Sequence, residues 1–190
     1  MIGNDIVDLT EAKQNSNWQR PRFLEKLFTL HEQQLIQNSE YPFLMVWRLW
    51  SMKEAAYKLY TQLHPSRFYK PKQFECKIEN LKGTVNYQDF QCYLRTKITS
   101  QYILSEARLV NTDFISEVLE IESSSITNQS AILKAQLLLK LADRMQLLKH
   151  DLNIVKSEFG TPSVYHKSER LDLGISLTHH GHYGAYGFSN

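Results

Sequence analysis

The chain has 190 residues, of which 42% are hydrophobic and 12% aromatic, enough to form one large core or two small ones. This composition excludes a disordered chain, a collagen and a disulfide scaffold. Lys and Arg number 22 against 20 Asp and Glu, so the net charge of +2 gives no reason to expect a nucleic-acid partner. Cys76 and Cys92 have no His or Cys beside them, so neither a zinc site nor a disulfide framework is predicted.

The sequence gives no indication of a membrane or secreted location. Its apolar runs, such as Phe43–Val46, are far shorter than the roughly 20 residues that cross a bilayer. The segment Met1–Leu9 carries two acids and no basic stretch, so a signal peptide is not expected. We therefore expect a protein of the reducing cytoplasm with no membrane partner.

The first half of the chain begins with a predicted strand and continues with helices. Met1–Leu9 is rich in β-branched residues, which favours a strand. Pro21–Asn38 is predicted to be helical, and Thr29 and Glu32 have the spacing of a capping box within it. A second helix is predicted over Phe43–Leu63.

Strands are predicted next, and then the order repeats. Alternation over Gln73–Val110 predicts an antiparallel meander with a turn at Lys82-Gly83, and the polar stretch 111–129, which includes three consecutive serines, predicts a linker. Ser130–His150 has apolar residues at helical spacing. The predicted strands after it are Asn153–Lys156, Ser163–His166 and Gly174–Phe188, with turns at 160–162 and 167–172.

Each half therefore runs helix first and sheet after, which predicts an α+β fold made of a duplicated module. The modules are residues 1–110 and residues 130–190, joined by the linker at 111–129. A short similarity between Lys97–Tyr102 and Ser176–Tyr183 agrees with an internal repeat.

Glu54 lies on an aromatic face of the predicted helix 43–63. At about 100° per residue, Trp47 and Trp50 are about 60° apart, Glu54 projects between them, and Lys58 follows one turn later. An acid between two tryptophans needs a cation or a hydrogen-bond donor to offset its desolvation. The alternative is an exposed Glu54–Lys58 pair at i, i+4 spacing.

Asp5 presents the same problem, because it lies within an apolar strand. Mg²⁺ binds one or two carboxylates together with water and substrate phosphates, so a single Mg²⁺ would satisfy both Asp5 and Glu54. Asp8 could instead be the ligand, or a turn or cap residue.

Three histidines lie near the end of the chain. Alternation within a strand sends His180 and His182 to one face and His179 to the other, so they are not expected to bind one metal together. A single histidine with Thr178 and backbone N–H groups near a glycine suits an anion such as phosphate; the alternative is a structural histidine. No Walker loop, dinucleotide fingerprint or serine nucleophile elbow is present in the sequence.

Together these motifs resemble the 4'-phosphopantetheinyl transferases. That family carries a short Gly-x-Asp-Ile strand, here residues 3–6, and a Trp-x-x-Lys-Glu-Ala-x-x-Lys helix, here residues 50–58. It also carries a Gly-x-Pro turn, here residues 160–162, and a Ser/Thr-His strand, here residues 178–179. The Lys-Glu helix is the most specific of the four motifs, and together they span nearly the whole chain.

The resemblance implies a transferase that moves 4'-phosphopantetheine from coenzyme A to a serine of an apo acyl or peptidyl carrier protein and releases adenosine 3',5'-bisphosphate. Such reactions serve fatty-acid, polyketide or peptide synthesis. The resemblance also implies Mg²⁺ held by Asp5 and Glu54, with Glu54 as base and Lys58 balancing the leaving diphosphate. The residues it implies for coenzyme A binding are Thr178, His179, Gly160, Pro162 and, more loosely, Lys140.

This sequence departs from the family pattern at several points. Val7 stands where two-half members often have a second acid, and Thr161 replaces a lysine often found inside the Gly-x-Pro turn. The motif order is that of a circularly permuted two-half member. We therefore expect a monomer whose modules pack as a pseudo-dimer around one site. The alternative is the small trimeric synthase, but about 120 residues separate Glu54 from His179, which favours two modules.

Two other classes of protein fit these motifs less well. A non-catalytic module that binds coenzyme A or a carrier protein would not require Asp5, Glu54 and Lys58 together. A Mg²⁺-dependent phosphohydrolase of unrelated fold usually shows a denser acidic cluster.

Overall fold

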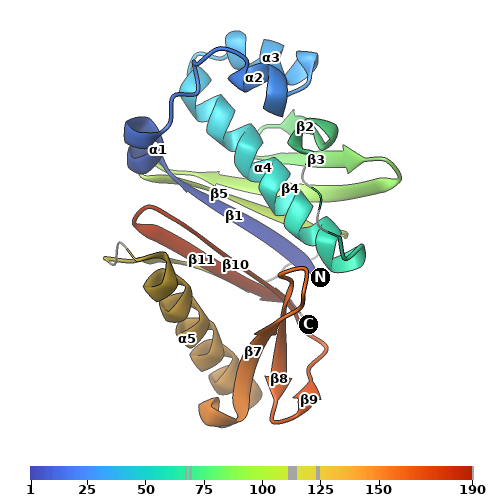
Figure 1. Cartoon of the computed structure of the whole chain (residues 1–190), viewed down its shortest axis with the longest axis vertical. Helices are drawn as coiled ribbons and strands as arrows, with labels where there is room; N and C mark the ends of the chain where they lie inside the picture. Colours follow the sequence, from blue (N-terminus) through green and yellow to red (C-terminus); the bar gives the residue numbers. More distant parts are fainter. Residues whose placement is uncertain (67, 69, 111–114, 123–124, 190) are drawn as a thin grey trace.

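The computed structural model describes residues 1–66, 68, 70–110, 115–122 and 125–189. The fold is α+β, as predicted, with helices packed on antiparallel sheets. Figure 1 shows two layered parts, one built on α4 and the other on α5, with strands β1 and β10 side by side where the parts meet.

The first half contains one five-stranded sheet with the strand order β1-β5-β4-β3-β2, in which all neighbours are antiparallel. The elements are β1 (Ile2–Asp8), α1 (Leu9–Asn15), α2 (Phe23–Leu27), α3 (Leu30–Gln37), α4 (Pro42–Leu63), the 3-10 helix η1 (Pro71–Gln73), β2 (Glu75–Glu79), β3 (Lys82–Tyr87), β4 (Phe90–Ile98) and β5 (Tyr102–Arg108).

The second half contains two three-stranded antiparallel sheets, with the orders β10-β11-β6 and β7-β8-β9. The elements are β6 (Ile115–Glu120), α5 (Ile126–Met145), the 3-10 helix η2 (Lys149–Asp151), β7 (Leu152–Lys156), β8 (Pro162–His166), β9 (Glu169–Arg170), β10 (Gly174–His180) and β11 (Tyr183–Ser189).

The two halves share one connectivity. In each half, the first strand precedes a long helix, and the final strand pairs with the first strand and with its own hairpin partner. Thus β5 lies between β1 and β4, and β11 lies between β6 and β10. They differ in the hairpin after the helix, which joins the large sheet in the first half and forms a separate sheet in the second. The shared connectivity agrees with a duplicated module, while packing as a pseudo-dimer stays a prediction.

The helices of the first half differ in part from those predicted. The capping box is confirmed, because the Thr29 side chain accepts from the Glu32 N–H and the Glu32 side chain accepts from the Thr29 N–H. The single helical segment over Pro21–Asn38 is wrong, because the backbone becomes extended at Phe28 and separates α2 from α3. Helix α1 was not predicted.

Two predicted strand boundaries are also wrong. Lys82 and Gly83 lie within β3. The preceding turn includes Asn80, which has a φ of 53°, and asparagine tolerates such a positive φ better than most residues do. The last predicted strand is two strands, β10 and β11, with a turn at Gly181, where φ is 56°.

The expected linker at 111–129 is not free of regular structure. Strand β6 occupies residues 115–120, and α5 begins at Ile126 after the Ser125 side chain accepts from the Asn128 N–H. Residues 111–114, Ser123 and Ser124 lie outside the described residues. Helix α5 ends at Met145, ahead of the predicted His150, because Gln146 adopts a φ of 54°.

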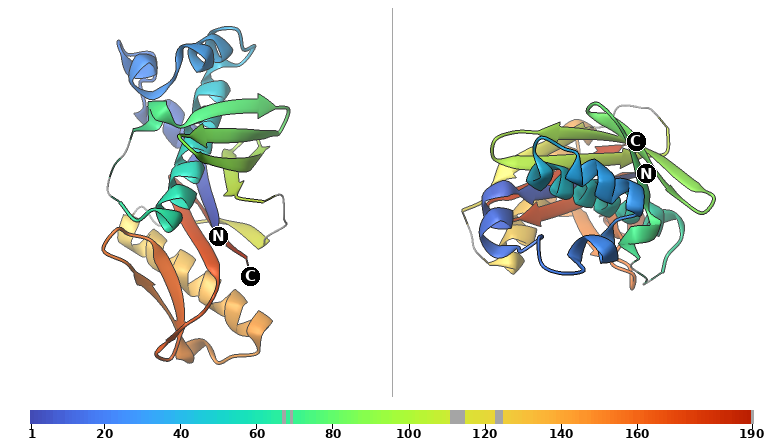
Figure 2. Two further views of the ribbon diagram at one scale, coloured as in Figure 1. Left: turned by 90° about the vertical axis from the view of Figure 1, so that its right-hand side faces the viewer. Right: turned by 90° about the horizontal axis from the view of Figure 1, so that it is seen from above.

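Each half has its own apolar core, and a third cluster joins them. Helix α4 covers one face of the large sheet, and α5 packs on β10 and β11. Between the halves lies a small cluster of buried side chains from β1, β5 and β11. Both chain termini lie at this junction (Figures 1 and 2). The residues of the joining cluster are Ile6, Tyr102, Leu104, Tyr183 and Ala185.

A fully buried ion pair holds α3 against α4. Lys53 Nζ lies 2.8 Å from Glu32 Oε1, and both side chains are 0% exposed. Lys53 also donates to the carbonyls of Pro71 (3.0 Å) and Phe74 (2.5 Å). Glu32 accepts from the backbone N–H of Cys76 at 2.8 Å. The lysine that precedes Glu54 in the helix motif is therefore a packing residue.

Candidate active site

Strands β1 and β10 meet through side chains instead of a backbone ladder. Side chains of alternate residues on β10 accept hydrogen bonds from alternate backbone N–H groups on β1. We call this contact the β1–β10 seam. Its three hydrogen bonds run from Asn4 N to Ser176 Oγ (3.0 Å), from Ile6 N to Thr178 Oγ1 (3.3 Å) and from Asp8 N to His180 Nδ1 (3.0 Å).

Asp5 lies at this junction and contacts both halves of the chain. Lys58 Nζ on α4 donates to Asp5 Oδ1 at 2.8 Å and to the Asn4 carbonyl at 3.0 Å. Thr178 Oγ1 on β10 donates to the same Asp5 Oδ1 at 3.1 Å. Asp5 is 8% exposed, so these two donors offset the desolvation of its carboxylate. Three residues predicted for the site therefore meet at one atom.

Helix α4 carries Glu54 one turn before Lys58, so both side chains leave the same face of the helix. The helix passes close to β1, because a Cβ on Gly3 would lie 2.1 Å from the Ala55 carbonyl oxygen. Glu54 is half-buried. Burial and, second to it, the negative charge of Glu54 raise the pKa of Tyr57. Helix α4 therefore carries both Glu54 and Lys58, the lysine that donates to Asp5.

The Asp5 carboxylate has an oxygen that suits a hard divalent ion. Both hydrogen bonds that described residues donate to the Asp5 carboxylate end on Oδ1, which leaves Oδ2 as the oxygen for a metal. Across the described ranges, no three His, Cys, Asp or Glu residues gather as a metal site. Mg²⁺ needs only one or two protein carboxylates when water and substrate phosphates complete its shell. Asp5 and Glu54 would be those carboxylates.

Asp8 is a cap residue, one of the alternatives that its position left open. Its Oδ1 accepts from the N–H groups of Thr10 (2.8 Å) and Glu11 (3.1 Å) and so begins α1. Its Oδ2 accepts from the His182 N–H at 2.9 Å. His182 lies in the turn between β10, which ends at His180, and β11. The prediction that it shares a strand face with His180 is therefore wrong.

A cavity of about 220 Å³ lies between α4 and the β7–β8 hairpin. It brings Lys58 together with Gly160 and Pro162, the two predicted residues of the Gly-x-Pro turn. Gly160 has a φ of 84°, which favours glycine, and apart from its chain neighbours no atom of the described residues lies within 4 Å of where its Cβ would be. Ser176 of the β1–β10 seam also lines this cavity.

His179 leaves β10 on the opposite face from Thr178, because side chains alternate along a strand, and it lines a hollow with Gly181 and His182. Burial lowers the pKa of His179, and the positive charges of Lys58, Lys156 and His180 lower it further. Lysines from both halves therefore act on one imidazole. Such a group of basic side chains suits a phosphate ligand.

Lys156 was not identified from the sequence. It lines the cavity beside Lys58 and lies opposite Pro162 in the β7–β8 pairing. The sequence does contain a usable indication: a hairpin around Gly160 places the last residue of the predicted strand Asn153–Lys156 next to the Gly-x-Pro turn. Lys156 thus supplies a cation near the position where Thr161 replaces a lysine.

Lys140 lies apart from the other predicted residues. Its Nζ lies 2.6 Å from Glu117 Oε1, and Tyr186 Oη donates to Glu117 Oε2 at 2.5 Å. Hydrogen bonds from Lys140 and then Tyr186 lower the pKa of Glu117. Lys140 does not line the cavity beside Lys58 as the described residues form it. Its role in coenzyme A binding stays a prediction.

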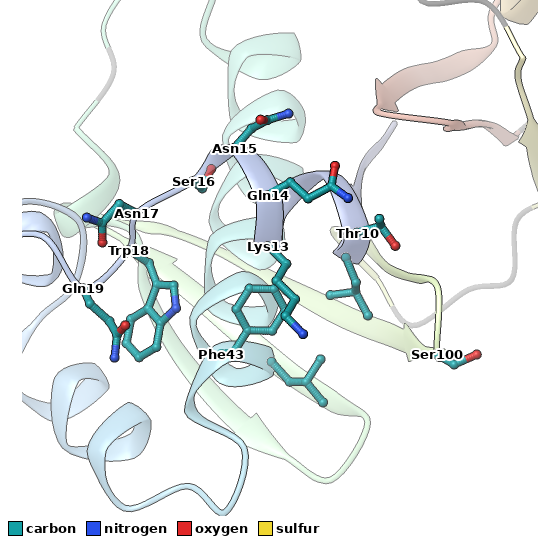
Figure 3. A pocket seen from close by; sticks show the side chains of 12 residues that line it. Thr10, Lys13, Gln14, Asn15, Ser16, Asn17, Trp18, Gln19, Phe43 and Ser100 are labelled. Carbon is teal, nitrogen blue, oxygen red and sulfur yellow. The ribbon is translucent and has the colours of Figure 1, made fainter.

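A larger hollow of about 1330 Å³ lies beside α1. Figure 3 shows Trp18, Phe43 and Lys13 facing this hollow. Among the described residues that line it, none is a predicted site residue. Size alone therefore does not single out the smaller cavity that Lys58 and Lys156 line.

Comparison with known proteins identifies the family of this chain. The family model of the 4'-phosphopantetheinyl transferase superfamily matches residues 1–110, more than half of the chain, and the protein belongs to that superfamily. Members are transferases of phosphopantetheine that take it from coenzyme A, act on carrier proteins and typically use a divalent metal. No match was found among curated proteins.

The matched part contains Asp5, Glu54 and Lys58 but none of the predicted residues of the second half. The case for Gly160, Pro162, Thr178 and His179 therefore depends on where they lie. Among the helices that the structure describes, none has the length and apolar character needed to span a bilayer.

Proposed function

We propose that this protein transfers 4'-phosphopantetheine from coenzyme A to a serine of an apo acyl or peptidyl carrier protein and releases adenosine 3',5'-bisphosphate. The observation that carries the proposal is the meeting of the two halves at Asp5. Lys58 of the first half and Thr178 of the second donate to one oxygen of this buried carboxylate. The cavity with Gly160 and Pro162 adjoins the same lysine.

Lysines and the turn would hold the diphosphate and the ribose phosphate of coenzyme A. Lys58 and Lys156 both line the cavity, and both act electrostatically on His179. Ammonium groups donate hydrogen bonds to phosphate oxygens and neutralise their charge. Lys58 would balance the charge that develops on the leaving diphosphate.

Asp5 and Glu54 would hold Mg²⁺, which supplies charge neutralisation and orientation of the diphosphate when it is bound. Glu54 would accept the proton of the carrier serine, directly or through water, as the serine oxygen attacks the β-phosphorus. The pantetheine stays on that phosphorus, and the bond from the phosphorus to the bridging oxygen of the diphosphate breaks. Adenosine 3',5'-bisphosphate leaves with the electron pair of that bond.

The proposal is tested by the intact mass of an apo carrier protein after incubation with coenzyme A, Mg²⁺ and this protein. A mass gain equal to one phosphopantetheine group on the carrier supports it. The matched control replaces the carrier serine with alanine, which should block the gain. An unchanged mass for apo acyl and apo peptidyl carriers alike, with bound coenzyme A demonstrated separately, would favour a non-catalytic binding module.

A further inference from the structure

We propose that Thr178 is a positioning residue for the metal-binding carboxylate of Asp5 and does not bind a phosphate of coenzyme A. The inference rests on the proposed metal site at Asp5 and assigns Thr178 a different task within it. The observation behind it is the contact between the two side chains: Thr178 Oγ1 donates to Asp5 Oδ1 at 3.1 Å.

The hydrogen-bond capacity of the hydroxyl carries the first step. A threonine hydroxyl has one hydrogen to donate and two lone pairs that accept. An ionised carboxylate only accepts, so Thr178 uses its single hydroxyl hydrogen in the hydrogen bond to Asp5. One lone pair accepts the Ile6 N–H at 3.3 Å. Phosphate oxygens also need a donor, and Thr178 has none left to give.

Accessibility gives the second step. Thr178 is 5% exposed, and it faces β1 across the β1–β10 seam. His179, the other residue of the Thr-His motif, leaves β10 on the opposite face, and the positive charges of Lys58 and Lys156 help to lower its pKa. The two residues of the motif therefore lie on different faces of β10, and Thr178 is the one that faces Asp5.

The geometry at Asp5 gives the third step. Lys58 from α4 and Thr178 from β10 approach Oδ1 from two elements in different halves of the chain. Two donors on one oxygen restrict rotation of the carboxylate and so determine where Oδ2 points. Hydrogen bonds of this kind orient metal ligands, and their removal typically weakens metal binding about 10- to 100-fold.

The experiment compares two binding constants in one set of variants. Mn²⁺ binding is measured by electron paramagnetic resonance with coenzyme A present and carrier absent, so no turnover occurs. Coenzyme A binding is measured by calorimetry in EDTA, so no metal contributes. We expect Thr178→Val to weaken Mn²⁺ binding about 10- to 100-fold. We expect coenzyme A binding in EDTA to change less than about threefold, because no phosphate contact is lost.

Three further variants separate positioning from folding. Thr178→Ser keeps the hydroxyl and should restore Mn²⁺ binding to near the wild-type value. Thr96→Val removes a buried hydroxyl on β4 that contacts Ser105 and does not touch Asp5, so Mn²⁺ binding should be retained. In an Asp5→Asn background, Thr178→Val should add little to the loss of Mn²⁺ binding, because the two residues act through one oxygen.

The outcomes distinguish this inference from the proposed function. A tenfold or greater loss of coenzyme A binding in EDTA, with Mn²⁺ binding unchanged, would overturn the inference and return Thr178 to a phosphate contact. Wild-type Mn²⁺ binding that Thr178→Val leaves intact would overturn the inference alone. Wild-type protein that binds no Mn²⁺ and modifies no carrier would overturn the proposed metal site together with the inference.

Discussion

At the scale of single residues, the acid on α4 is the group on which turnover should depend most. We expect Glu54→Gln to lower turnover about 10²- to 10⁴-fold while coenzyme A binding stays near normal, because the change removes a metal ligand and a base together. Carrier modification followed by mass spectrometry gives the rate. Glu75→Gln, an exposed acid on the edge strand β2, is the matched control. Near-normal modification by the Glu54 variant would mean that the chemistry lies elsewhere.

His179 should make stability depend on pH. Its folded-state pKa is lowered by burial and by Lys58, Lys156 and His180, so the unfolded chain binds the proton more readily. The contribution is present above the unfolded pKa of about 6.5 and is lost as the pH falls through the lower folded value. Urea unfolding from about pH 7.5 to 5.5 should show a steeper loss in the wild type than in His179→Gln. The exposed His31→Gln variant should follow the wild type; equal slopes for all three would contradict the assignment.

At the scale of elements, the pair Glu32–Lys53 should hold α3, α4 and the start of β2 together. Lys53→Met leaves a carboxylate buried without its cation, which typically costs about 3–5 kcal/mol of stability. The double variant Glu32→Gln, Lys53→Met should recover part of this loss, because no unpaired charge remains. Urea unfolding measures both, and Lys72→Met at an exposed lysine is the control. A Lys53 variant as stable as this control would show that the pair contributes little.

Local patterns predicted the elements well where the pattern was long. The 22-residue helix α4 and strand β1 follow the sequence closely, because a continuous apolar face and a run of β-branched residues each leave one favourable choice. The break at Phe28, the turn at Asn80 and strand β6 were missed. Each depends on partners distant in the sequence or on a single backbone angle, which periodicity does not report.

The site was predictable in its parts but not in its contacts. The motif residues Asp5 and Lys58 come together as an acid and its cation. Nothing in the spacing indicates that Thr178, 173 positions away, donates to Asp5, or that Lys156 joins Lys58 in a cavity. Both contacts follow from packing of one half against the other, a property of the folded chain.

At the scale of the whole molecule, one chain brings together residues of both halves at Asp5. We therefore expect a light-scattering mass near 22.3 kDa, that of one chain. In a mixture of inactive Glu54→Gln with His179→Ala protein we expect no recovery of activity, because each site draws on one chain. Each variant alone at the doubled concentration is the control. A trimer mass or recovered activity would support sites between subunits and leave the proposed reaction intact.

Side chains occupy much of the outer edge of β1. Gln62 donates to the Ile2 carbonyl at 2.6 Å, Lys58 donates to the Asn4 carbonyl, and the β1–β10 seam accepts the N–H groups at residues 4, 6 and 8. An unpaired strand edge invites pairing with another chain and so promotes aggregation. Here five of the backbone groups that would recruit such a strand already have side-chain partners. The contacts that assemble the site therefore also hinder addition of a further strand at the β1 edge of the five-stranded sheet.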